Sequence, residues 1–413
     1  MGFVVPEGLP IQGGGSHPKR HGRHKNEQDP VYDTVSHGEN PENSSWAPWR
    51  RVRSTCLPAI PSMVIIQAVN PDSLPDLAGP VPCGRQHTEE DMLKRSILGA
   101  VLAIGVAVAI FAALKIHADR HFYEGYDPDA PLNAHVSEPE SVEGTVKAFG
   151  QQTPARYRRQ RIEIDARPGE RVPAILTLPF SADAPVPVIV LLHGSHQEKE
   201  FVEKICTPFN EAGFAMVCFD QDMRGERKVE GGAPAMALAF RARCWKTVHD
   251  ARRLIDYLAT RPDIARDRIY LVGASYGAIT GTALLAQEKR IKAADLVVGG
   301  GNLRLLSKAP EVRRELPGWI LPLAGPLLAF VLAPAEPLVH APATAGIPVL
   351  MQNGSKDGVV IPESGKALFA ALGEPKELRW YPVNHPDREE KGEEVVKMLM
   401  DGLGWLVQRD AIR

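Results

Sequence analysis

The C-terminal part of the chain alternates short apolar runs with longer segments in which apolar residues recur at helical spacing. The run at 186–192 is almost wholly apolar, as is typical of a parallel strand covered on both faces. Strands alternating with helices predict an α/β fold, with a mostly parallel twisted sheet that binds ligands at the carboxyl ends of its strands. The expected strands lie within 186–192, 214–219, 268–273, 294–298, 347–351 and 377–381.

Two segments ahead of these runs alternate apolar and polar residues, at 161–166 and 172–178. The turn residues Arg167, Pro168 and Gly169 separate them, so the pattern predicts an antiparallel hairpin at the edge of the sheet. A last helix is expected near 388–408.

A different pattern occupies 96–114, an uncharged apolar run long enough to cross a bilayer as one helix. Lys94 and Arg95 precede it, and Lys115 and Arg120 follow it. We predict a single-pass transmembrane helix or signal anchor, because a basic segment directly before an apolar run resembles the start of an export signal. The part of the chain after this helix would then lie on the exported side of the membrane. A buried globular helix and a cleavable signal are the alternatives.

The segments on either side of this helix show no sustained periodicity. Residues 1–91 contain a glycine run, several prolines and a basic stretch dotted with histidines, so we predict disorder. A second hypothesis is that Met92 is the true start and that the stretch before it is a wrongly assigned extension. Residues 121–155 are interpreted as a linker, and 156–413 as the domain that carries the candidate catalytic residues described below.

Composition narrows the function classes only slightly. The net charge of -2 gives no electrostatic indication of nucleic-acid binding. The five cysteines are odd in number and lack metal-ligand spacing, so neither a disulfide framework nor a metal or other cofactor is expected. Cys206 and Cys244 could still pair if the domain is exported. The oligomeric state is not indicated.

Candidate chemistry begins at Ser275, in the segment Gly273-Ala-Ser-Tyr-Gly277 behind an apolar strand. A strand that turns sharply into a helix at this serine would expose its hydroxyl as a nucleophile, and the two glycines would let strand and helix approach closely. The backbone N–H of Tyr276, and that of Ser195 after the strand at 186–192, could form an oxyanion hole.

A serine nucleophile needs a histidine base and an orienting carboxylate. Asp357 follows the strand expected at 347–351, and His385 follows the strand expected at 377–381. An Asx-type turn and a capping histidine are the alternative interpretations of these two residues. The chain order Ser, Asp, His, with each residue after a strand, is the order of the α/β-hydrolase nucleophile elbow.

On these residues the chain resembles the α/β-hydrolase superfamily, specifically its dienelactone-hydrolase, acetyl-xylan-esterase and prolyl-oligopeptidase-like branches. The resemblance covers roughly 156–413. In the family Arg-Gly is often followed by a small residue and a glycine, whereas Glu226 and Arg227 follow Gly225 in this chain. The other matching residues are His193-Gly194, the Asp222-Met-Arg224-Gly225 segment, Trp245, 250–258, Arg261-Pro-Asp263 and Arg268-Ile269.

The resemblance implies a serine hydrolase, most simply a carboxylic-ester hydrolase acting on a small-molecule ester or acyl substrate. A serine peptidase of the prolyl-oligopeptidase-like type and a catalytically silent binding protein on the same fold are the alternatives. In this family an insertion such as 303–346 commonly forms a lid, so its apolar residues are predicted to line the substrate pocket. These residues are Trp319, Leu323, Leu327 and Phe330. A buried excursion of the core is the alternative.

Overall fold

The computed structural model describes residues 89–181, 185–315, 317–386 and 392–412. The prediction of a disordered or wrongly assigned extension at 1–91 lies outside these residues, apart from 89–91, which begin a helix. Cys56 and Cys83 also lie outside the described residues. The described cysteines Cys206, Cys218 and Cys244 are free and buried.

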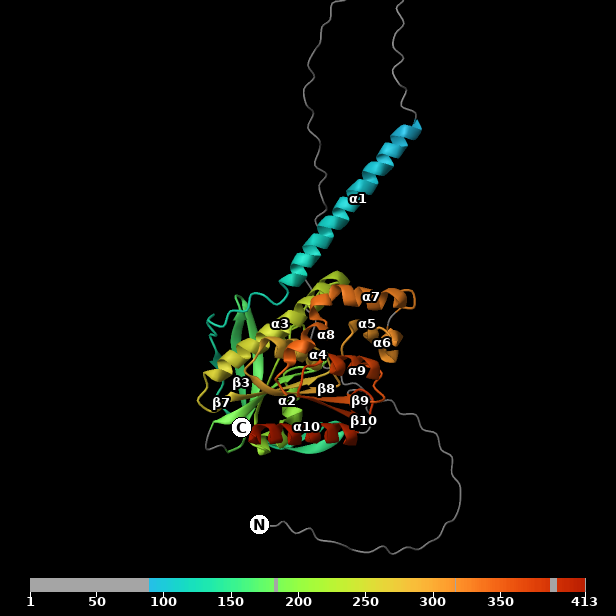
Figure 1. Cartoon of the computed structure of the whole chain (residues 1–413). Helices are drawn as coiled ribbons and strands as arrows, with labels where there is room; N and C mark the ends of the chain where they lie inside the picture. The colour runs from blue at the N-terminus through green and yellow to red at the C-terminus, as the bar shows by residue number, and fades with distance from the viewer. Residues whose placement is uncertain (1–88, 182–184, 316, 387–391, 413) are drawn as a thin grey trace, which may run out of the picture. The chain divides into compact units, whose positions relative to one another are not determined.

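A ten-stranded sheet forms the centre of the domain, in the order β1-β3-β4-β6-β5-β7-β8-β9-β10, with β2 also paired to β3 (Figure 1). Strands β5 to β10 run parallel to one another, while β1 to β4 are antiparallel. The mostly parallel α/β sheet predicted from the apolar runs is therefore confirmed. The strands are β1 His135–Val136, β2 Glu140–Ala148, β3 Gln151–Arg167, β4 Glu170–Leu178, β5 Val186–Leu192, β6 Ala215–Phe219, β7 Ile264–Ala274, β8 Ile291–Val297, β9 Val349–Gly354 and β10 Lys376–Tyr381.

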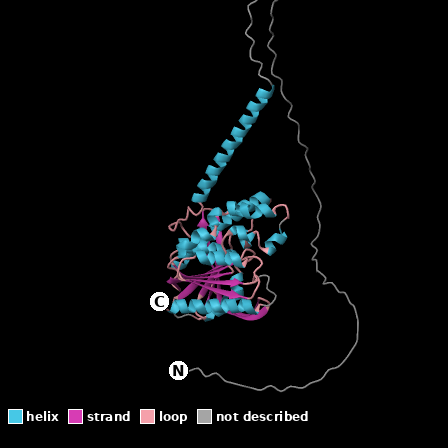
Figure 2. Ribbon diagram, turned by 45° about the vertical axis from the view of Figure 1, so that its right-hand side comes forward, coloured by secondary structure: helices cyan, strands magenta, loops and turns pink. Residues whose placement is uncertain are grey.

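Helices cover both faces of this sheet (Figure 2). One apolar core contains side chains of α2 and α10, and a second core on the opposite face contains side chains of α3, α4 and α9. Cys206 of α2 lies in the first core and Cys244 of α3 lies away from it, so the pairing left open by the sequence does not form. The helices are α1 Glu89–Arg120, α2 Phe201–Glu211, α3 Ala233–Ala259, α4 Tyr276–Gln287, α5 Leu303–Leu306, α6 Pro310–Glu315, α7 Leu321–Val331, α8 Pro337–His340, α9 Pro362–Ala371 and α10 Glu393–Ala411, with 3-10 turns η1 Gly225–Arg227, η2 Ala333–Ala335 and η3 Ala341–Thr344.

The prediction of a linker at 121–155 is wrong. Strands β1 and β2 and the start of β3 belong to the sheet, and the stretch before β1 is fixed to α3 by a buried arginine. The Arg253 guanidinium donates to the carbonyl oxygens of Asp127 and Ala130 at 3.1 and 2.6 Å. A partner so far along the chain cannot be found by local periodicity, which is why the segment looked unstructured. The predicted hairpin forms as β3 and β4, with β1 and β2 beyond it.

Helix α1 has the properties of a membrane span by length and composition. Its apolar part has a mean hydropathy of 2.8, and none of it is buried against the domain. The helix is longer at both ends than the predicted 96–114. A signal sequence meets the same criteria, so span and signal remain the two interpretations of α1.

Candidate active site

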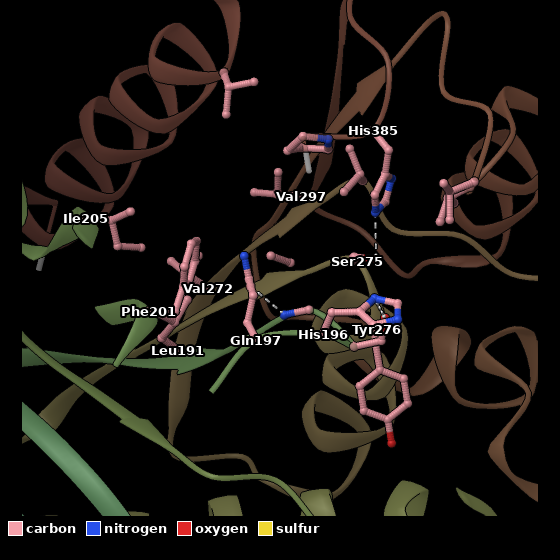
Figure 3. Close-up of a pocket in the computed structure, with 18 of the residues that line it drawn as sticks. Leu191, His196, Gln197, Phe201, Ile205, Val272, Ser275, Tyr276, Val297 and His385 are labelled. Carbon is pink, nitrogen blue, oxygen red and sulfur yellow. Dashed lines mark hydrogen bonds between the residues drawn. The ribbon is translucent and has the colours of Figure 1, made fainter. Parts of the chain in front are cut away.

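The structure brings the three residues Ser275, His385 and Asp357 into one hydrogen-bonded chain, although they are far apart in sequence. Figure 3 shows the bond between Ser275 and His385. The Oγ of Ser275 lies 2.9 Å from Nε2 of His385, and the Nδ1 of His385 lies 2.8 Å from Oδ2 of Asp357. The histidine and the aspartate are buried, at 5% and 3% exposure. This arrangement can move a proton from the serine hydroxyl to the imidazole while the carboxylate fixes the ring.

Ser275 stands on a strained turn between β7 and α4. Its φ of 54° and ψ of -115° are rare for a residue with a side chain. The glycines on either side are required by close backbone approach, because a Cβ on Gly277 would lie 1.9 Å from the carbonyl oxygen of Leu192 and one on Gly273 would lie 2.6 Å from that of Gly277. Strand and helix therefore meet at contact distance, and the hydroxyl is held at the carboxyl edge of the sheet.

The loop after β9 fixes Asp357 through its second oxygen. Oδ1 accepts hydrogen bonds from the backbone N–H groups of Val359 and Val360, both at 2.8 Å. Asn384 joins this loop to the histidine loop, since its Oδ1 accepts from the N–H of Gly358 and that of His385. The carboxylate thus has one oxygen for its own loop and one for the histidine. Asn384 was not predicted, although its position next to His385 was a usable signal.

The two predicted oxyanion residues, Ser195 and Tyr276, both line the cavity that contains Ser275. Tyr276 begins helix α4, and a helix N-terminus favours negative charge. The loop that carries Ser195 is fixed by His193, whose ring Nδ1 lies 2.7 Å from the Gly194 carbonyl oxygen. Burial lowers the pKa of His193 to about 4, so its ring is neutral near neutral pH and donates to that carbonyl.

A buried arginine that was not predicted, Arg243 of α3, contacts both predicted oxyanion residues. Its guanidinium is 3.4 Å from the carbonyl oxygen of Ser195, 3.0 Å from Oε1 of Gln221, and 4.1 Å from the centre of the Tyr276 ring. Gln221 in turn donates to the carbonyl oxygen of His193. The planar fork of arginine suits these simultaneous contacts, and a lysine cannot reproduce them.

We expect Arg243→Lys to lower kcat about tenfold and Arg243→Met to lower it about 100-fold, with little change in KM. Both substitutions would let the oxyanion loop and the Tyr276 ring shift, which weakens stabilisation of charge in the transition state more than substrate binding. Steady-state kinetics with kcat and KM determined separately, alongside thermal unfolding, would check this. Loss of stability with an unchanged kcat would assign Arg243 a purely structural role.

A cavity of about 860 Å³ opens beside Ser275, within the size range of small-molecule sites. Its wall is mainly apolar. Residues of the β2–β3 hairpin, of α2 and α10, and of the short helices α5 and α6 contribute to it. Within the described part of the chain, no group of three or more His, Cys, Asp or Glu side chains is arranged to hold a metal ion.

The prediction that Trp319, Leu323, Leu327 and Phe330 line the substrate pocket is wrong. Their exposed fractions are 77%, 62%, 53% and 49%, and the cavity wall receives Leu306, Glu311 and Val312 from the predicted lid at 303–346 instead. Helix α7 packs through Gly325, whose Cβ would lie 2.5 Å from Ser307 Oγ, so its opposite face is left exposed. Because α7 is apolar on all sides, its sequence does not indicate which face packs.

The unusual Glu226 and Arg227 after Gly225 take part in ion pairs rather than disturbing the loop. Glu226 contacts Lys199, and Arg227 contacts Asp250, at 2.7 and 2.6 Å. A side chain at Gly225 is excluded, because a Cβ would lie 2.1 Å from the carboxylate of Asp220. The loop therefore retains its glycine and is held by charged neighbours.

A second buried carboxyl, Asp295 of β8, also lines the cavity. Its Oδ2 accepts a hydrogen bond from Nε2 of Gln352 at 2.8 Å, and the residue is 3% exposed. Burial raises the pKa of Asp295 to about 7 from an ordinary value of 3.8. Burial disfavours the charged form, so the carboxyl holds its proton at pH values where an exposed aspartate has lost it.

This raised pKa predicts that the free energy of unfolding falls when Asp295 loses its proton, and that Asp295→Asn removes this loss. The folded state binds the proton more tightly than the unfolded state, so stability falls as pH rises from 3.8 to about 7 and then levels off. At alkaline pH the asparagine variant should be the more stable protein, by at most about 4 kcal/mol. Urea unfolding of both proteins across this range would test it, and parallel pH profiles would contradict the raised pKa.

Comparisons with known proteins agree with this architecture. A family model described as Serine aminopeptidase, S33 matches residues 183–333. The esterase YjfP of Escherichia coli (strain K12) is 23% identical over 223 residues, which is 52% of this chain and 86% of that protein. Acetyl xylan esterase from Paenibacillus sp. R4 superimposes with a TM-score of 0.51 at 18% identity, over 71% of this chain and 93% of that one. Acetyl xylan esterase 1 from Thermoanaerobacterium sp. JW/SL YS485 gives 0.52 at 17% identity, over 72% and 93%. The sheet order, the nucleophile elbow and these superpositions show that the chain has the α/β-hydrolase fold.

Proposed function

We propose that the protein is a serine hydrolase that cleaves carboxylic esters through an acyl-enzyme intermediate on Ser275. The observation that carries this proposal is the hydrogen-bonded chain from Ser275 Oγ through His385 to Asp357, with separations of 2.9 and 2.8 Å. The esterase names of the relatives support an ester as the substrate.

In this reaction His385 Nε2 takes the hydroxyl proton as Ser275 Oγ bonds to the carbonyl carbon. The N–H groups of Ser195 and Tyr276 stabilise the oxyanion, and Asp357 stabilises the imidazolium. When the tetrahedral intermediate collapses, the bond to the alcohol oxygen breaks and His385 returns the proton to that oxygen. Water then repeats the sequence on the acyl-enzyme and releases the carboxylic acid.

A serine peptidase is the second candidate, because the matching family model is described as a serine aminopeptidase. Amide hydrolysis would use the same three side chains, so their geometry does not separate the two activities. A silent binding protein is less well supported, because the three groups lie within hydrogen-bonding distance of one another.

A fluorophosphonate probe tests the proposal directly. The probe should modify the protein at a single residue, and peptide mapping by mass spectrometry should locate it at Ser275. Turnover of p-nitrophenyl esters without turnover of aminoacyl arylamides would support the esterase, and the reverse would support the peptidase. Absence of both labelling and turnover would contradict acyl transfer at this site.

We also propose that α1 anchors the protein in a membrane, with the catalytic domain on the exported side. The helix has the length and hydropathy of a span. Phe330, one of the exposed residues of α7, stacks on Phe111 of α1 with 6.3 Å between ring centres, and Lys115 lies over the same ring. Since Phe111 lies within the apolar run, the exposed face of α7 would lie near the lipid.

Carbonate extraction of membranes tests the anchor. The wild-type protein should stay in the pellet, whereas Leu102→Arg with Ile110→Arg should be released, because each central arginine costs about 3 kcal/mol in a spanning helix. Leu102→Ile with Ile110→Leu is the matched control and should stay in the pellet. Release of the wild type would contradict anchoring, and full protection of the domain from protease added to intact cells would contradict the orientation.

A further inference from the structure

The cavity beside Ser275 has two arms that differ in chemistry and in the elements that form them. The first arm runs between the sheet and the α2–α10 face, where it is walled by Leu191, Phe201, Ile205, Val272 and Met398. Figure 3 shows Ser275 and His385 on one side of Gln197, with Leu191, Val272, Phe201 and Ile205 on the other. The second arm is walled by Leu306, Glu311, Val312, Val359 and Val360.

The direction of proton transfer decides which part of a substrate enters which arm. His385 must give its proton to the leaving alcohol, so the alcohol has to lie on the histidine side of Ser275. Val359 and Val360 donate their N–H groups to Asp357, the residue that holds His385, so the second arm is on that side. The acyl group lies on the other side of the carbonyl carbon and therefore occupies the first arm.

The first arm is mainly apolar beyond Gln197, with the buried Asp295 as a polar group on its α10 side. Leu191, Ile205 and Val272 are buried, at 1%, 4% and 4% exposure, and they belong to the apolar core of that face. Protein interiors are close-packed, and an unfilled apolar space costs stability, so a space of this kind suits an apolar ligand. Lys147 and Lys204, both exposed, line the cavity as well and provide charge near the solvent.

We propose that the first arm is the acyl-binding site and that the enzyme prefers esters of linear medium-chain fatty acids over acetate esters. Ile205 and Phe201 of α2 and Val272 of β7 set this chain-length preference. The inference rests on the proposed acyl transfer at Ser275 and adds the substrate class to it. The proposed acyl group is longer than the acetyl group, which appears in the names of the two structural relatives.

A series of p-nitrophenyl esters from acetate through butyrate, hexanoate and octanoate to decanoate tests the proposal. For the wild type, kcat/KM should rise about fourfold for each methylene group buried in the arm, and the rise should stop when the chain reaches solvent. An acetate optimum, or a profile without dependence on chain length, would overturn the acyl-site assignment. If the acyl-site assignment fails in this way but the enzyme still hydrolyses the acetate ester and Ser275 is still labelled, the proposed function remains supported.

Substitutions in α2 locate the site. Ile205→Trp should fill the arm and lower the octanoate-to-acetate ratio of kcat/KM at least tenfold, whereas Phe201→Ala should move the optimum to longer chains. Leu306→Trp places the same large ring in the second arm and should leave the chain-length ratio unchanged while altering the preference for the alcohol group. A ratio that responds equally to Ile205→Trp and Leu306→Trp would contradict the assignment of the arms.

Fluorophosphonate labelling of each variant confirms that the site is folded before kinetics are compared. If Ile205→Trp does not label, Ile205→Ala gives the complementary test, because a widened arm should weaken the preference for medium chains. A second measurement uses alkyl phosphonate probes of different chain length on the wild type. Faster labelling by the longer alkyl chain supports the proposal, and equal rates contradict it.

Discussion

Ser275→Ala should lower kcat for ester hydrolysis by on the order of 10⁶-fold, the loss that follows removal of the nucleophile in serine hydrolases that use a histidine and an aspartate. Without the hydroxyl, His385 has no proton to take from Ser275, and the acyl-enzyme cannot form. Residual activity should reflect binding and the oxyanion N–H groups only. Steady-state kinetics with a p-nitrophenyl ester, together with fluorophosphonate labelling, would measure this loss.

Ser275→Gly is the informative companion variant. The backbone at this position, with φ of 54° and ψ of -115°, is costly for alanine and acceptable for glycine. Both variants should be inactive, but the glycine variant should be more stable than the alanine variant by about 1 kcal/mol. Denaturant unfolding would show the difference. Substantial activity or labelling in either variant would place the nucleophile elsewhere.

Local sequence patterns were sufficient for strands β3 to β10 and for the positions of the three central side chains. Apolar runs identified β5 to β10 because strands buried on both faces have few polar residues. Each of the three side chains follows one of these strands, and carboxyl ends of parallel strands lie at the same edge. Proximity of Ser275, Asp357 and His385 followed from that topology.

The features that could not be predicted depend on partners distant in the chain. The segment at 121–155 has no periodicity of its own until β1, and Arg253 of α3 supplies donors for its carbonyl groups. Arg243 is one arginine among many in sequence, and only the fold places it between Ser195 and Tyr276. Helix α7 shows the same difficulty for apolar residues, since its composition indicates burial of one face without identifying it.

The wrongly predicted linker contributes to the site as well as to the fold. Ala148 and Phe149, at the turn of the β2–β3 hairpin, line the cavity beside Ser275. The ring of Phe149 lies 6.4 Å from that of Phe201 on α2, at an interplanar angle of 80°. If the β2–β3 hairpin closes the first arm, the chain-length preference also depends on this hairpin, which lies outside the alternating strands and helices of the domain.

Asp357→Asn should lower kcat about 10⁴-fold while leaving the fold and the labelled serine in place. The two N–H groups of Val359 and Val360 hold the carboxylate through Oδ1, so the asparagine oxygen has to occupy that position. Its NH₂ group then points at His385 Nδ1. The ring must accept there and carry its proton on Nε2, which leaves no lone pair to take the proton of Ser275.

The predicted loss therefore arises from the wrong tautomer of His385, and it can be separated from a general effect of losing a carboxylate. Asp401→Asn makes the same chemical change in α10, where the aspartate accepts from the hydroxyl of Tyr381, and should leave kcat roughly unchanged. Both variants should be compared by steady-state kinetics and by thermal unfolding. An Asp357→Asn enzyme with kcat within about tenfold of wild type would show that another group orients His385.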